Sequence, residues 1–245
     1  ALKIENYFMF KGRIRALVAA AIAILATSLL SNSSNATALT ANLEAPQHLA
    51  DLSNSDLAID QLNSLPVKGR APKTGYKRAQ FGQEWADVDR NGCDTRNDIL
   101  KRDLTNTVFK AKTRDCVVLS GLLNDPYSGE QVDFLRGERT SSLIQIDHVV
   151  ALSNAWQTGA FQKTLVERTQ LANDPLNLLA VKGSLNNQKG DGDAATWLPP
   201  LKSYRCTYVA RQIAVKKKYG LWVTPPEKAA MSAILAKCPD QKVVG

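Results

Sequence analysis

The residues of this chain that could do chemistry lie between positions 145 and 189. A Gln-Ile-Asp-His segment ends at His148, Asn177 and Asn186 follow nine positions apart, and Lys189 comes three positions later. The chain has two histidines, and the other, His48, lies in a segment poor in core residues. A catalytic histidine would therefore be His148. A base, a metal ligand and amide groups at such intervals are typical of a one-metal phosphodiesterase site.

The surrounding residues predict two strands and a helix that would hold these side chains. Ile144 and Ile146 alternate with polar residues, which predicts a half-buried strand that ends with Asp147 and His148. The apolar run 176–181 predicts a second strand. A helix expected from position 184 onward would place residues 186 and 189 on one face, because residues three apart are neighbours on a helix.

This order of strand, insert, strand and helix resembles the HNH endonucleases of the ββα-metal fold. The segments 174–178 and 186–190 are similar to the secreted bacterial branch of that family, as are 190–193 and 197–199. The similarity extends from about Val67 to Leu235. It implies an α+β fold in which a ββα-metal (HNH) core is embedded in a mostly helical, disulfide-stabilised domain.

The resemblance also implies roles for the site residues. His148 would be the general base, since an imidazole of ordinary pKa near 6.5 is largely neutral at pH 7. Asn177 would hold the imidazole ring through an amide hydrogen bond. Asp147 and Asn186 would bind one divalent metal, Mg²⁺ or Mn²⁺, because both offer hard oxygen ligands. Many family members have His at the position of Asn186, and Asn187 could take its place if the helix began one residue differently.

Several basic residues are candidates for substrate contacts. Lys189 would contact a substrate phosphate, although by position alone it could be a solvated helix lysine. Arg136 and Arg139 precede the catalytic strand. Arg211 and Lys216 belong to a basic stretch with interleaved aromatics, which could follow a nucleic-acid backbone or form the solvated face of a helix.

The N-terminal part predicts export. Residues 1–38 have basic residues, then the uncharged run 16–30, then a small-residue segment that ends at Ala38, as in a signal peptide. The run is shorter than the roughly 20 residues that span a bilayer, so cleavage near Ala38 and secretion are favoured over an N-terminal membrane anchor. Residues 39–75 predict a linker or N-terminal arm with one short helix that stops at Pro66, and 76–240 predict the nuclease domain.

Charge and cysteine content agree with an exported protein. The net charge of +8 suits a polyanionic substrate. Four cysteines permit three disulfide pairings, and we expect neighbours in sequence to pair, Cys93 with Cys116 and Cys206 with Cys238. A four-cysteine zinc site is the alternative, but no Cys-x-x-Cys spacing is present.

The sequence thus predicts a secreted, metal-dependent endonuclease that cuts DNA, with RNA as the alternative substrate. Little sequence preference is expected, because no recognition module is present. No stable membrane association is expected after signal cleavage. The alternative is a non-catalytic extracellular DNA-binding or surface protein that retains the fold. The sequence contains neither His-Glu-x-x-His nor Gly-x-Ser-x-Gly, which argues against a metalloprotease or a serine esterase.

Overall fold

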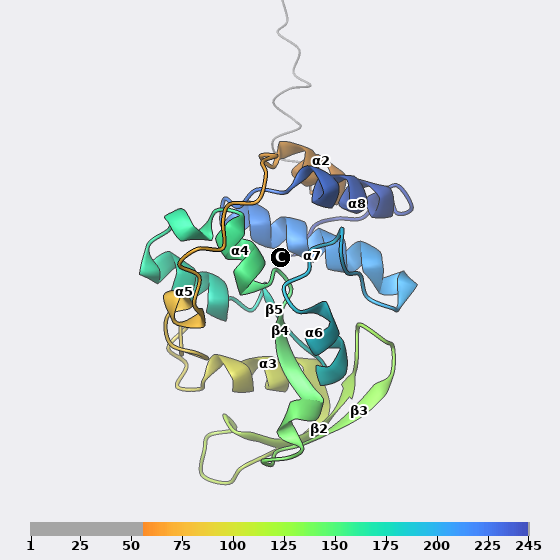
Figure 1. Cartoon of the computed structure of the whole chain (residues 1–245). Coiled ribbons are helices and arrows are strands. Elements are labelled where there is room, and N and C mark those ends of the chain that lie inside the picture. Colours follow the sequence, from red (N-terminus) through yellow and green to blue (C-terminus); the bar gives the residue numbers. More distant parts are fainter. Residues whose placement is uncertain (1–55, 245) are drawn as a thin grey trace, which may run out of the picture. The chain divides into compact units, whose positions relative to one another are not determined.

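The computed structural model describes residues 56–244, and these form helices and two small antiparallel sheets (Figure 1). The α+β class expected from the sequence is confirmed. The predicted signal peptide, its cleavage site at Ala38, the arm residues 39–55 and His48 lie outside the described residues. Within 56–244, no helix combines the length and the hydropathy that crossing a membrane requires.

A two-stranded ribbon followed by a helix lies at the centre of the described residues (Figure 1). Strand β4 (Ile144–His148) pairs antiparallel with β5 (Leu178–Lys182), and α6 (Gly183–Lys189) follows directly. Because side chains alternate along a strand, the ribbon contributes to two different cores. Ile144, Ile146, Leu178 and Ala180 face one core, and Leu179 and Val181 face the other.

The first core lies between the ribbon and a three-stranded sheet. The sheet has the order β1 (Leu104–Phe109), β2 (Val118–Asn124) and β3 (Gln131–Leu135), with all pairs antiparallel. Helix α3 (Thr95–Asp103) packs against it and begins at Asp94, whose side chain accepts a hydrogen bond from the backbone N–H of Asn97. The helix ends before Leu104, which has extended backbone and starts β1.

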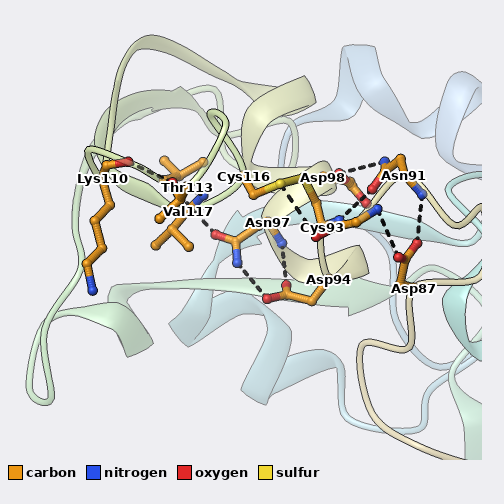
Figure 2. Close-up of a disulfide and its surroundings, with 12 residues drawn as sticks. Asp87, Asn91, Cys93, Asp94, Asn97, Asp98, Lys110, Thr113, Cys116 and Val117 are labelled. Carbon is orange, nitrogen blue, oxygen red and sulfur yellow. Dashed lines mark hydrogen bonds between the residues drawn. A yellow bond between two sulfur atoms is a disulfide. The ribbon is translucent and has the colours of Figure 1, made fainter.

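A disulfide fastens the segment before α3 to the loop between β1 and β2. Cys93 is bonded to Cys116, as predicted from their proximity in sequence (Figure 2). Next to it, the Asp87 carboxylate accepts hydrogen bonds from the backbone N–H groups of Asn91 and Gly92. These bonds close the polar turn that precedes the helix.

The second core is built by three helices on the other side of the ribbon. Helices α2 (Ala58–Ser64), α7 (Arg205–Lys218) and α8 (Pro225–Leu235) pack on one another (Figure 1). The second predicted disulfide, Cys206 with Cys238, joins α7 to the segment after α8. Leu62 and Leu65 are buried here, so the described part of the predicted arm is not a free linker. The short helix expected before Pro66 is α2, whose Leu62 is buried in this core.

Helix α8 was not predicted from the sequence, although its start carries a clear signal. Its first turn carries a capping box between Thr224 and Glu227, with prolines at the first two helical positions. This is a recognised signal for a helix start.

A third cluster anchors the segment that leads from α2 to the ribbon. Helices α4 (Leu152–Gln157) and α5 (Leu165–Asn173) pack around Phe81 from the short 3₁₀ helix η2 (Arg78–Phe81). Backbone bonds from Lys68 to Val223 and from Ala71 to Gln157 fix the approaching chain. The remaining 3₁₀ helices are η3 (Ser141–Leu143), η4 (Ala160–Gln162) and η5 (Lys202–Tyr204). The chain after α2 is thereby brought to the end of β4.

Candidate active site at the end of strand β4

A polar cavity of about 260 Å³ lies at the end of β4. Its polar lining residues are Tyr76, Arg78, Asp147, His148, Ser153, Asn186 and Asp191. A larger cavity of about 530 Å³, bordered by Lys163, Asp174 and Tyr219, contains none of the predicted site residues. The smaller cavity is therefore the better candidate for a site of chemistry.

His148 is held as a neutral imidazole. Its Nε2 lies 2.9 Å from the carbonyl oxygen of Ala172. Because a carbonyl only accepts hydrogen bonds, Nε2 must carry the proton, and the lone pair resides on Nδ1. Burial lowers the pKa of His148 to about 4, helped by the charges of Arg78 and Lys189 and opposed by the bond to Ala172. The ring is thus neutral at pH 7, with Nδ1 able to take a proton.

An aromatic ring lies nearly parallel to this imidazole. The Trp85 ring stacks on His148 with centroids 6.2 Å apart and an interplanar angle of 16°. The backbone of Trp85 has φ of 55°, a region that bulky residues rarely adopt and that is often retained for function. Trp85 therefore restricts the orientation of the imidazole plane.

Asp147 points to the opposite face of the ribbon from His148, because successive side chains alternate. Its Oδ2 accepts a hydrogen bond from the Tyr127 hydroxyl at 2.5 Å, and its Oδ1 lies 2.9 Å from the Lys189 ammonium. Lys189 also donates to the backbone oxygen of His148. Burial raises the pKa of Asp147, and the Lys189 charge and the Tyr127 hydroxyl oppose that rise. The predicted contact of Lys189 with a substrate phosphate is wrong, because its ammonium is buried in an ion pair with Asp147.

Asn177 does not hold the imidazole directly. Its side chain is fully buried, accepts a hydrogen bond from the Val150 N–H, and donates to the carbonyl oxygens of Val150 and Leu171. The predicted bond from its amide to the ring is therefore wrong. It instead fixes the backbone just after His148 and just before Ala172, whose carbonyl contacts the ring. Asn177 thus contacts the surroundings of the imidazole through main-chain groups alone.

Asn186 borders two neighbouring cavities. Its Nδ2 donates to Gln145 Oε1 at 2.8 Å, which turns its Oδ1 into the atom available to a cation. It lines the His148 cavity and an adjacent one of about 390 Å³ that includes Trp85 and Arg96. Asn187, the alternative ligand, is exposed and lines neither cavity.

Asp147 and Asn186 both line the His148 cavity, and each carries a side-chain oxygen of the kind that Mg²⁺ prefers. A carboxylate has about four lone-pair sites, and the two hydrogen bonds to Asp147 use two of them. Within residues 56–244 no group of three or more His, Cys, Asp and Glu side chains is arranged to hold a metal. A metal held by these two side chains would need its remaining ligands from water or substrate, as Mg²⁺ commonly does.

The predicted substrate-binding residues are dispersed. Arg136, just after β3, donates to the Val118 carbonyl of β2 and to Asn97 Oδ1 of α3, and Arg211 donates to the Leu176 carbonyl. Arg139 is exposed. None of the three lines the His148 cavity.

The predicted contact of Lys216 with substrate is wrong. Its side chain has no solvent exposure, and its ammonium lies 2.9 Å from Glu227 Oε1 and donates to the Trp222 carbonyl. A side chain sealed in this way does not reach a substrate.

Sequence reasoning missed Arg78 and Trp85. Both belong to the segment before α3, far from β4 in sequence. Long-range packing brings them to the ribbon, around Phe81 of the third cluster for Arg78 and against the first core for Trp85. No local pattern signalled their place. Asp191, in contrast, lies in a Gly-Asp-Gly-Asp run that the resemblance had already singled out.

Comparison with known proteins gives one family and one related protein. Residues 94–234 match the family described as "GmrSD restriction endonucleases, C-terminal domain". A protein described as "Uncharacterized secreted protein" from the fungus Arthroderma benhamiae is 37% identical over 190 residues, which cover 77% of this chain and 88% of the relative. No solved structure matches. The family match covers more than half of the chain and contains the whole of β4, β5 and α6, so this chain belongs to the family of GmrSD restriction endonuclease C-terminal domains.

Proposed function

We propose that this protein is a secreted endonuclease that hydrolyses phosphodiester bonds of DNA, with His148 as the general base and one divalent metal. Family membership supports a nuclease-type function. Secretion is supported by the description of the fungal relative. The same reaction could hydrolyse the phosphodiester bonds of RNA. Digestion assays with plasmid DNA and with RNA distinguish the two substrates.

The observation that carries the proposal is the state of His148. Its Nε2–H is committed to Ala172, so Nδ1 is the atom that accepts a proton from an attacking water. Once the ring is protonated, the Ala172 carbonyl stabilises the charge on Nε2–H. Trp85 and the backbone bonds of Asn177 keep the imidazole in one orientation, which is what a general base requires.

We propose that Asp147 and Asn186 form the ligand set of a ββα-metal core, with Mg²⁺ or Mn²⁺ as the metal. When bound, the metal supplies positive charge that stabilises the phosphoryl group as it is attacked. Asp147 provides the only negative charge of the pair, and the Lys189 ammonium partly neutralises it. We therefore expect weak metal binding in the absence of substrate.

The two adjacent cavities suggest the path of a nucleic-acid strand. The His148 cavity and its neighbour share Ile146 and Asn186, and the neighbour is lined by Trp85 and Arg96. These groups offer stacking and a positive charge, and neither reads a particular base by a hydrogen-bond pattern. The proposal therefore includes low sequence specificity.

Digestion of plasmid DNA by the purified protein tests the proposal. We expect cutting with Mg²⁺ or Mn²⁺, none with a chelator, and none by His148→Ala under any metal. His48→Ala is the matched control, because it removes the other histidine of the chain. Equal cutting by His148→Ala would reject the mechanism. Salt-sensitive DNA binding without any cutting would favour the non-catalytic DNA-binding protein instead.

A further inference from the structure

We infer that Arg78 binds the phosphodiester beside His148 and is the cation that positions it for attack. The identity of the substrate rests on the proposed nuclease function, but the binding of a phosphodiester by Arg78 does not require cleavage. Lys189, the cation expected at this place, is buried on Asp147. The site therefore needs another group to meet the negative charge of the substrate.

Arg78 is the one lysine or arginine among the described residues that line the cavity. The other cations nearby have partners: Arg70 pairs with Asp193 at 2.6 Å, and Lys73 with Asp191 at 3.0 Å. A guanidinium presents N–H groups in a planar fork that matches two phosphate oxygens, which an ammonium does not. Arg78 thus has both the location and the shape for a phosphodiester.

The hydrogen-bonding capacity of Arg78 is unused. Its Nη1 is buried and has no acceptor within the described part of the chain. Its Nε lies 3.7 Å from Glu84 Oε1, beyond hydrogen-bond distance, and the Glu84 side chain is 61% exposed. An exposed ion pair of this kind contributes little, and a buried unpaired donor costs free energy that an incoming acceptor recovers.

The backbone that carries Arg78 is fixed. Phe81 of the same 3₁₀ helix is fully buried, and the Gln80 carbonyl accepts a 2.6 Å hydrogen bond from Arg168 on α5. Gly82 ends the helix at φ of 71°, where an added Cβ would lie 2.2 Å from Thr169 Oγ1. Arg78 is therefore presented to the cavity by a rigid support, as binding with little loss of entropy requires.

Titration of the full chain with dimethyl phosphate, followed by the NMR signals of its two histidines at one pH, tests the inference. We expect dimethyl phosphate to shift the His148 signal in the wild type and in Arg90→Gln, and to bind at least about tenfold more weakly to Arg78→Gln. Arg90→Gln is the matched control, since it removes the same charge from a residue that does not line the cavity. Arg78→Lys should bind with intermediate affinity, because it keeps the charge and loses the fork.

Cleavage of plasmid DNA provides the second readout. We expect kcat/KM to fall by about 10²-fold in Arg78→Gln, as for the loss of one transition-state donor. Unchanged dimethyl phosphate binding in Arg78→Gln, no binding by the wild type, or equal cutting by the variant would each overturn the role of Arg78. A wild type that binds dimethyl phosphate through Arg78 but leaves nucleic acid intact would reject the nuclease proposal alone. Thermal melting confirms that each variant is folded.

Discussion

The Lys189 ammonium lies 2.9 Å from Asp147 Oδ1, and both side chains are almost completely excluded from solvent. The pair joins α6 to β4 one residue before His148, and a second bond from Lys189 to the His148 carbonyl ties the same two elements. The ion pair is thus part of the framework that places the imidazole. Removal of one partner would leave a buried charge without compensation.

Lys189→Met is expected to destabilise the protein by about 3 kcal/mol or more, because it leaves the Asp147 carboxylate buried and unpaired. The double variant Asp147→Asn with Lys189→Met should lose less than the sum of the single variants, since no charge remains. Urea unfolding of the four proteins measures the coupling. A loss below about 1 kcal/mol for Lys189→Met would contradict the buried pair.

The stability of the protein should fall as the pH drops from 6.5 toward 4. In this window the unfolded chain protonates His148, whose ordinary pKa is 6.5, while the folded chain does not until about pH 4. The contribution is fully present above pH 6.5 and is lost as the pH approaches 4, and it amounts to about 3 kcal/mol. Urea unfolding at pH 7, 5.5 and 4.5 should therefore show a steeper loss for the wild type than for His148→Gln. Parallel losses would contradict the lowered pKa.

The activity should have its acidic limb well below pH 6.5. The base form of His148 persists down to about pH 4 in the free protein, so a decline of kcat/KM near pH 6.5 is not expected from this residue. The sequence alone had predicted an ordinary imidazole. The dependence of kcat/KM on pH, at saturating metal, measures the difference, and an apparent pKa near 6.5 would show that burial of the ring is incomplete.

Strands β4 and β5 and helix α6 were predictable because the alternation of apolar and polar residues in β4 and the apolar run of β5 are local signals. The side-chain roles were less so. Asp147 and His148 are neighbours in sequence, but their side chains lie on opposite faces of a ribbon that is buried on both faces. The side chain of Asn177 bonds to main-chain groups, which no sequence pattern indicates. The contribution of Arg78 depends on long-range packing around Phe81. The sequence thus indicated residues that line one cavity, but not which groups each side chain contacts.

The burial of Lys216 could nevertheless have been predicted from the sequence. Val209, Ile213 and Lys216 are spaced by four and three residues, so they share one helix face, and that face is the core side of α7. We predict that Lys216→Met destabilises the protein by about 3 kcal/mol, since Glu227 would remain buried and unpaired. The matched variant Lys217→Met, at an exposed position, should change stability by less than about 0.5 kcal/mol.

The dependence of DNA affinity on salt concentration provides a second test for Lys216. Lys216→Met should leave the slope unchanged, because a buried ammonium releases no counterion from DNA. A reduced slope for Lys216→Met in a folded protein would restore its predicted role in substrate binding.

The two disulfides should differ in their effect on activity. Each closes a loop, with sequence separations of 23 and 32 residues, and removal of either is expected to cost about 3 to 4 kcal/mol.

Cys93–Cys116 (Figure 2) also supports the turn next to Trp85, whose carbonyl accepts a hydrogen bond from the Thr95 N–H. The Cys93→Ser, Cys116→Ser variant should therefore also lower kcat/KM, because the Trp85 ring that restricts His148 loses its support. The Cys206→Ser, Cys238→Ser variant should keep kcat/KM well below its melting temperature, since that bond lies in the helical core away from the cavity. Equal losses of kcat/KM in the two variants would contradict the role of Trp85.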